Sequence, residues 1–271
     1  AKKTAQEADA VILVVGTNSD WETEGNDRAD LGLPANQDEL VDAVLAENKN
    51  TVVVINSGSP VSMPWEDQSK AILQSWFGGQ EYGNALMDIL FGEVNPSGKL
   101  PTTFPKRIED TPAFSCYPGE NSQMDYEEKL LVGHRWYERK NIKSLFPFGH
   151  GLSYTDFSYG DLEISVGDNA DVVCRFNIEN IGDMDGQEVA QCYVSYESSP
   201  SDEPIKSLQS FKKVLIEKQK KQEIEIHLNA RNFSYWDVKD KDWKIRAGSY
   251  SIEIGSSSEK IELSETITLG N

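Results

Sequence analysis

Short apolar runs near the start of the chain predict buried, parallel strands. Residues 11–15 (VILVV) and 51–56 (TVVVIN) are nearly continuous runs of apolar and β-branched side chains, a pattern typical of strands covered on both faces. Pro34 can open a helix between them. That helix is indicated by apolar residues at helical spacing, namely Leu40, Val41, Val44 and Leu45. Strand, loop, helix and strand in this order predict a βαβ unit.

A further strand and helix follow in the same half of the chain. Residues 71–77 (AILQSWF) form an apolar stretch, and the segment after it has Gly92 as a stop signal. Its apolar residues again recur at helical spacing, namely Ala85, Leu86, Ile89 and Leu90. The first half of the chain is therefore predicted to be α/β with a mainly parallel sheet.

The pattern changes near residue 157 to short segments, many of which alternate apolar and polar residues, separated by turn signals such as Gly167-Asp168 and Gly182-Asp183. Roughly seven such segments predict an antiparallel β-sandwich with immunoglobulin-like spacing. The aromatic-rich stretch before them predicts ordered connecting loops, because so many aromatic side chains are costly to expose. We therefore divide the chain into an incomplete α/β sandwich domain at 1–115, connecting loops at 116–155 and a β-sandwich at 156–271.

Composition narrows the classes of partner. The 271 residues carry a formal charge of -19, which repels nucleic-acid phosphates and anionic membrane surfaces. Three scattered cysteines are too few for a disulfide framework or a metal knot. No run approaches the ~18 apolar residues of a membrane helix, and residues 1–10 lack the apolar centre of a signal peptide. We expect a cytoplasmic protein with neither nucleic-acid nor membrane partners, unless a secretion signal has been removed.

The loop after the first strand carries an unusual number of acidic residues: Asp20, Glu22, Glu24, Asp27 and Asp30. In open α/β sheets, ligands bind beyond the carboxyl ends of strands, where this loop falls. A solvated acidic turn is the simplest interpretation. A calcium loop is a second, although the twelve-residue spacing with its glycine and terminal bidentate glutamate is missing.

General acid/base chemistry is a third interpretation of this loop. One carboxyl must then hold a proton near neutral pH, and an apolar wall such as the Trp21 ring would raise the pKa of such a group. Glu24 precedes Gly25, where the backbone can bend to expose the carboxyl. Arg28 can hold Asp27 or a substrate hydroxyl. Residues alone leave the three interpretations open.

Several long blocks of the sequence resemble glycoside hydrolase family 3, of the β-glucosidase type. The blocks that resemble the second domain of that family are DWETEGNDRADLGLPANQDELVDAV, NTVVVINSGSPVSMPW, LQSWFGGQEYGNALMDILFGEVNPSGKLPTTFP and FPFGHGLSYTDF. The later blocks FKKVLIEKQ, RNFSYWD and AGSYSIEIGSSS are similar to its fibronectin type III-like domain. In order, these blocks span nearly the whole chain.

The resemblance implies a retaining, exo-acting β-glycosidase that removes terminal, non-reducing β-D-glucosyl residues from small oligosaccharides or aryl β-glycosides. An aspartate nucleophile comes from a separate (β/α)8 barrel, and retention places the two carboxyls about 5 to 5.5 Å apart. By its match to the family's Ser-Glu-Gly-x-Asp-Arg pattern, Glu24 is the implied acid/base, with Thr23 in place of the usual serine. Glu22 is the rival, and Trp21 and Arg28 are candidates for binding substrate. Two carboxylates suffice for this chemistry, so no metal and no cofactor are implied.

The barrel itself is missing from the pattern, because the 271 residues show no eightfold strand and helix repeat. We therefore expect part of an enzyme whose nucleophile is supplied by a barrel domain or chain. Alone, it should be inactive and tend to associate, since its sheet would keep an unpaired edge and an uncovered face. The alternative is a non-catalytic carbohydrate-binding or scaffolding fragment. For residues 231–236 (RNFSYW) we expect packing rather than recognition.

Overall fold

The computed structural model describes residues 1–25, 27–121 and 123–270. They fall into two compact units. The first contains residues 1–91 and 104–111, and the second contains residues 92–103 together with the chain from Pro112 onward. No helix in the described residues is long and apolar enough to cross a membrane.

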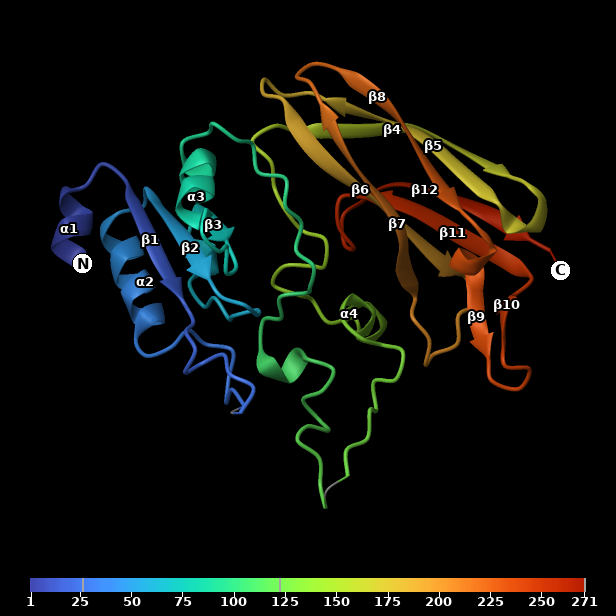
Figure 1. Cartoon of the computed structure of the whole chain (residues 1–271), viewed down its shortest axis with the longest axis horizontal. Helices are drawn as coiled ribbons and strands as arrows, with labels where there is room; N and C mark the ends of the chain where they lie inside the picture. Colours follow the sequence, from blue (N-terminus) through green and yellow to red (C-terminus); the bar gives the residue numbers. More distant parts are fainter. Residues whose placement is uncertain (26, 122, 271) are drawn as a thin grey trace. The chain divides into compact units, whose positions relative to one another are not determined.

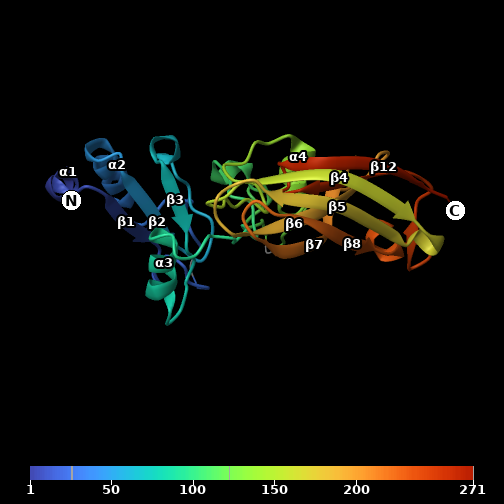
Figure 2. The same cartoon turned by 90° about the horizontal axis from the view of Figure 1, so that it is seen from above.

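The first unit is built on a parallel three-stranded sheet of order β1-β2-β3. Its strands pair in parallel from Val11 opposite Thr51 to Gly16 opposite Asn56, and Figure 2 shows them side by side. The predicted parallel α/β architecture is confirmed. The elements, labelled in Figure 1, are α1 (Lys2–Glu7), β1 (Val11–Gly16), α2 (Gln37–Glu47), β2 (Thr51–Asn56), the 3₁₀ turn η1 (Glu66–Gln68), β3 (Ala71–Gln74), α3 (Tyr82–Leu90) and the 3₁₀ turn η2 (Ile108–Asp110).

Two elements of this unit are shorter than the sequence pattern predicts. Helix α2 begins at Gln37, with Asn36 at its N-cap position, rather than at Pro34. Strand β3 ends at Gln74, and Trp76 two residues later has a φ of 55°, which is incompatible with an extended strand. The predicted strand at 71–77 is therefore cut short by a change of backbone conformation.

One face of the sheet is uncovered along β1. Side chains alternate along this strand, so that Val15 is buried whereas Ile12 and Val14 are 47% and 53% exposed. On the buried side, Val41, Val44 and Leu45 of α2 pack into the core. Among the described strands, β1 pairs only with β2, so its other edge is unpaired. These features fit the predicted uncovered face.

Replacing Ile12 and Val14 together by threonine is expected to reduce self-association of the isolated chain, because exposed apolar side chains on an open sheet edge drive association. Sedimentation velocity over a concentration series measures the effect. The matched control is Leu215→Thr, which removes a side chain that is 60% exposed on another strand, β7. Association that is unchanged in the double variant, or lowered equally by the control, would contradict this account of the sheet face.

The second unit is dominated by a β-sandwich. One sheet has the order β12-β11-β6-β7 and the other the order β4-β5-β8, and Figure 1 shows them as two layers. The prediction of about seven sandwich strands is confirmed. The strands are β4 (Phe157–Val166), β5 (Val172–Asn180), β6 (Gly186–Tyr196), β7 (Lys206–Ile216), β8 (Lys221–Leu228), β11 (Gly248–Gly255) and β12 (Ile261–Leu269).

The sandwich core follows from the alternation seen in the sequence. In β5, alternate residues from Val172 to Ile178 are buried, and so are alternate residues of β8 from Ile224 to Leu228. Short elements border the sandwich: α4 (His134–Lys140), η3 (Asp168–Ala170), η4 (Ala230–Phe233) and the hairpin of β9 (Ser234–Asp237) and β10 (Asp242–Ile245). This hairpin forms a two-stranded sheet of its own, which the sequence pattern does not predict.

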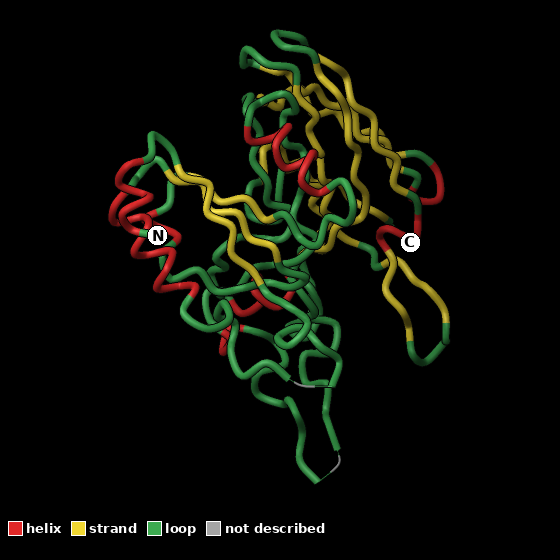
Figure 3. Tube along the Cα trace, turned by 60° about the vertical axis from the view of Figure 1, so that its left-hand side comes forward, coloured by secondary structure: helices red, strands yellow, loops and turns green. Residues whose placement is uncertain are grey.

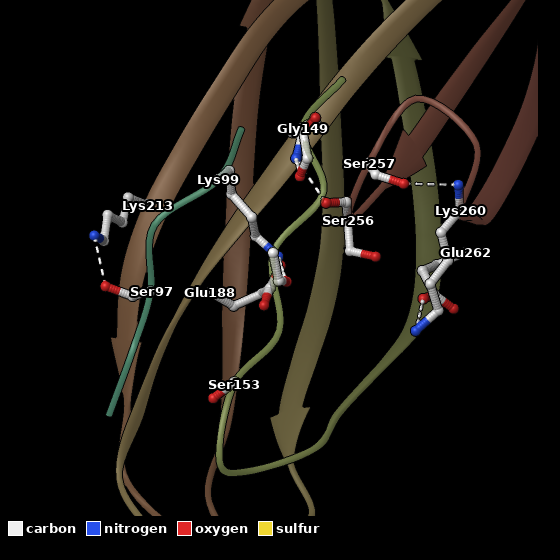
Figure 4. A network of polar contacts seen from close by, with 12 residues as sticks. Ser97, Lys99, Gly149, Ser153, Glu188, Lys213, Ser256, Ser257, Lys260 and Glu262 are labelled. Carbon is white, nitrogen blue, oxygen red and sulfur yellow. Dashed lines mark hydrogen bonds and ion pairs between the residues drawn. The ribbon is translucent and has the colours of Figure 1, made fainter. Parts of the chain in front are cut away.

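Segments outside the sandwich are attached to it by a polar network. Figure 3 shows that most of the chain between α3 and β4 is loop. Within it, Leu100 and Gly149 pair through the 2.8 Å hydrogen bond that the Gly149 N–H donates to the Leu100 carbonyl. Nearby, the Lys99 ammonium lies 3.1 Å from Glu188 of β6 and donates a 2.9 Å hydrogen bond to the Gly151 carbonyl. Lys99 and Glu188 are only 12% and 5% exposed. Figure 4 shows this ion pair against the sandwich strands.

Candidate active site

The acidic loop is held where β1 ends. Gln37, the first residue of α2, accepts a 2.8 Å hydrogen bond from the Gly16 N–H and donates another of 2.8 Å to the Gly16 carbonyl. Both backbone groups at the end of β1 are therefore fixed by one amide side chain. The loop that follows starts at the carboxyl end of the sheet, as the sequence predicts for a ligand site.

Glu22 connects this loop to the one after β2. Its carboxylate accepts hydrogen bonds from the Thr17 hydroxyl and, at 2.9 Å, from the Gly58 N–H. A Cβ at Gly58 would lie 2.5 Å from Glu22 Oε2 and 2.8 Å from the Phe77 ring, so any larger residue here would displace one of these two side chains. Glu22 therefore connects the loop after β1 to the loop after β2, a structural role that the sequence did not indicate.

Glu24 differs from its rival in its surroundings. It lines an open pocket of about 450 Å³ together with Trp21, Glu22, Thr23, Asp27, Arg28 and Ser59. Its side chain is exposed. No hydrogen bond or ion pair of Glu24 is found with any other residue that the structure describes. Of the two glutamates, Glu24 is the one whose carboxyl is available to a ligand.

Trp21, whose ring could provide an apolar wall for the Glu24 carboxyl, lines the same pocket. Trp21 is half-buried and its indole Nε1 lies buried, without a partner in the described part of the chain. Glu24 stays exposed in the same pocket. An environment that excludes water from this carboxyl must therefore come from residues outside this loop.

Arg28 anchors the loop to the turn after β2. Its guanidinium donates a 2.8 Å hydrogen bond to the Ser59 hydroxyl, whereas its Nε lies buried without a partner among the described residues. Burial lowers the pKa of Arg28, and the nearby carboxylates of Glu22 and Asp30 oppose that shift. Arg28 forms no ion pair with Asp27 or Glu24 in the described chain, so it does not neutralise the candidate acid/base.

Of the turn Ser57-Gly58-Ser59-Pro60 after β2, Ser59 lines the pocket. The contact of Gly58 with Glu22 could have been anticipated only from the glycine itself, since the partners lie 36 residues apart.

No group of three or more His, Cys, Asp or Glu residues that could hold a metal ion is found in the described ranges.

Comparison with known protein families identifies both halves of the chain. The model of the glycosyl hydrolase family 3 C-terminal domain matches residues 1–154, more than half of the chain. The chain belongs to glycosyl hydrolase family 3. The model of the fibronectin type III-like domain matches residues 188–258. The resemblance stated from the sequence is confirmed.

Individual relatives in this family support the same assignment. Thermostable beta-glucosidase B of Acetivibrio thermocellus is 41% identical over 274 residues, covering 100% of this chain and 36% of that protein. Probable beta-glucosidase I of Aspergillus niger is 40% identical, covering 96% of this chain and 33% of that protein. The chain thus spans about a third of the length of these curated relatives.

Solved structures of family 3 members share the fold. The Bifidobacterium adolescentis GH3 beta-glucosidase matches with a TM-score of 0.95 and 40% identity, over 99% of this chain and 40% of that one. The Kluyveromyces marxianus beta-glucosidase in complex with glucose matches with a TM-score of 0.95 and 38% identity, over 100% of this chain and 32% of that one. These matches confirm the α/β and fibronectin-like architecture, whereas the roles of Glu24, Glu22, Trp21 and Arg28 stay predictions.

Proposed function

We propose that this chain is the acid/base-bearing part of a retaining, exo-acting β-glucosidase. The observation that carries the proposal is the contrast between two glutamates on one loop. Glu22 is held by the Thr17 hydroxyl and the Gly58 N–H, whereas Glu24 is exposed in the open pocket. Family membership and the names of the relatives support the substrate class, terminal β-D-glucosyl residues.

The proposed reaction needs two carboxyl groups acting in turn. An aspartate supplied by a (β/α)8 barrel attacks the anomeric carbon, and the bond from that carbon to the leaving oxygen breaks as Glu24 donates its proton to the oxygen. Glu24, now a carboxylate, then takes a proton from water while the water oxygen attacks the anomeric carbon and releases the aspartate. Two inversions retain the β configuration.

The other residues of the pocket have supporting roles in this proposal. Glu22 and Arg28 hold the loop against the turn at residues 57–60 through their bonds to Gly58 and Ser59. The indole of Trp21 lines the same pocket and offers an apolar surface to the leaving group. Asp20 lies on the loop that follows β1, and we assign it no nucleophilic role, because the proposed nucleophile is an aspartate of the barrel.

The isolated chain is expected to show no hydrolysis of an aryl β-glucoside, because none of its described elements forms a barrel that could supply the nucleophile. Co-expression with a family 3 barrel should restore turnover. The measurement is release of 4-nitrophenol by the chain alone, by the barrel alone and by the two together. Turnover by the chain alone would contradict the proposal. A complex that binds glucoside but never hydrolyses it would favour a non-catalytic carbohydrate-binding role.

A further inference from the structure

One face of helix α4 carries two polar side chains whose polar atoms are buried without a partner. His134 and Glu138 are four positions apart, so they lie on the same face of the helix. Both carboxylate oxygens of Glu138 and the Nε2 atom of His134 are buried, and none has a hydrogen-bond partner among the described residues. The His134 ring centroid lies 4.8 Å from that of Phe148 and 6.0 Å from that of Tyr193 on β6. This face of α4 therefore packs within the sandwich unit, and the proposed reaction uses neither group.

Helix α4 depends on this packing because it is short. It has seven residues, and isolated helices of fewer than about 12 residues are marginal in water. Residues with positive φ bound it on both sides, Gly133 at 59° and Asn141 at 53°. Arg139 attaches the helix to the segment between β6 and β7, through hydrogen bonds of 2.8 Å to the Glu203 carbonyl and 2.9 Å to the Pro200 carbonyl. Contacts with the rest of the unit, rather than its own length, keep α4 helical.

The charged groups around Glu138 do not neutralise it. Lys206 of β7 favours ionisation of Glu138, but its ammonium is already paired with Glu253 of β11 at 2.9 Å. The side chains of that pair are 12% and 21% exposed. The negative charges of Glu253 and of Glu259, in the turn after β11, oppose ionisation. The other titratable groups on the elements packed here are His134 and Arg135 of α4 and Tyr193 of β6.

A carboxyl group in these surroundings is more stable with its proton than without it. Ionisation would leave a buried carboxylate with no hydrogen bond, and a group so placed keeps its proton instead. Burial raises the pKa of Glu138 to about 7, although the Lys206 charge opposes this shift. Burial, together with the positive charges of Arg135 and Lys206, lowers the pKa of His134 to about 4. Between these two values both side chains on this face of α4 are uncharged.

We propose that Glu138 is a pH-sensitive latch for α4: protonated, it lets the helix pack on the sandwich unit, and ionised by loss of its proton to water, it releases the helix. The unfolded chain loses this proton near pH 4.5 and the folded chain near pH 7. The contribution of Glu138 to stability is therefore complete below pH 4.5 and is lost as the pH rises through 7. His134 has the opposite effect, because its contribution is present above pH 6.5 and is lost as the pH falls toward 4. The latch lies in the second unit and does not depend on the role of Glu24.

The test compares the full 271-residue chain with Glu138→Gln, which keeps the size of the side chain but has no proton to lose. Between about pH 4.5 and pH 8.5, the Tm of the sandwich unit in the parent chain should fall by at least about 3 °C relative to Glu138→Gln, which corresponds to a tenfold change in the folding equilibrium. His134 titrates in both chains, so its effect cancels in the difference. Differential scanning calorimetry measures the Tm. Glu163→Gln is the matched control and should keep the parent profile, since Glu163 is exposed on β4.

Two local measurements show whether Glu138 acts on α4 itself. At about pH 8.5, amide hydrogen exchange across residues 134–140 should be faster in the parent chain than in Glu138→Gln, whereas at about pH 4.5 the two should agree. In ¹³C NMR, the glutamate carboxyl resonance that is missing from Glu138→Gln should titrate near pH 7 in the parent chain. A resonance that titrates near pH 4.5, or a difference in Tm that stays constant with pH, would overturn the proposal. So would a pH-dependent Tm without faster exchange in α4, because Glu138 would then affect the unit without releasing the helix.

Discussion

Replacing Glu24 by glutamine in the enzyme assembled with its barrel is expected to lower kcat about 10²- to 10⁴-fold toward glucosides with poor leaving groups, the usual contribution of general acid/base catalysis. Glutamine keeps the size of the side chain but has no proton to deliver to the leaving oxygen. For an activated aryl glucoside the first step should be nearly unaffected, because its leaving group departs without protonation. Steady-state kinetics with cellobiose and with 2,4-dinitrophenyl β-glucoside measure the contrast.

Glu22→Gln is the matched control for this prediction. The Glu22 carboxylate braces the loop through Thr17 and Gly58, and the glutamine amide oxygen can still accept a hydrogen bond. We therefore expect a smaller loss that is similar for good and poor leaving groups. If the dependence on leaving group appears in Glu22→Gln instead, the acid/base assignment moves to Glu22.

Removing either partner of the buried Lys99–Glu188 pair is expected to destabilise the sandwich unit by about 3 to 5 kcal/mol, the usual result of leaving one buried charge without its partner. The two side chains are 12% and 5% exposed. The Glu188 carboxylate also accepts a 3.2 Å hydrogen bond from the Tyr159 hydroxyl. In Glu188→Leu, the Lys99 ammonium would remain beside the Gly151 carbonyl without its counter-charge. Differential scanning calorimetry should show a fall of roughly 10 °C in the Tm of that unit.

Two further variants make this test specific. Lys99→Met combined with Glu188→Leu should recover much of the lost stability, because no buried charge is then left alone. Lys221→Met breaks an ion pair with Asp161 whose side chains are 50% and 62% exposed, and should change the Tm little. If Glu188→Leu is as stable as the parent chain, or lowers the Tm no more than Lys221→Met does, the stability of the sandwich unit does not depend on the Lys99–Glu188 ion pair.

Local periodicity predicted the main elements because each is specified by its own residues. The β-branched runs of β1 and β2 and the alternation in β5 and β8 determine which side chains can be buried. The interruption of β3 at Trp76 could not be predicted in this way, because a positive φ at a tryptophan has no local sequence signal. The hairpin of β9 and β10 was missed because each of its strands has only four residues.

The candidate site was predicted less completely, because it depends on contacts between distant segments. The family motif indicated Glu24 and its rival, but nothing in the sequence showed that Thr17 and Gly58 would bind Glu22. Lys99 and Glu188 lie 89 positions apart, and neither carries a sign that it will be buried. Trp236 looked like a core residue by type, yet its strand lies outside the two sandwich sheets.

The most direct test of the central claim is the product that Glu24→Ala, assembled with its barrel, forms from 2,4-dinitrophenyl β-glucoside in the presence of azide. Alanine leaves space for azide where the carboxylate would activate water, so azide should attack the glucosyl-enzyme. We predict faster turnover with azide and β-D-glucosyl azide as the product seen by proton NMR. Unchanged activity of this variant without azide, or no glucosyl azide with it, would contradict the role of Glu24 as the acid/base.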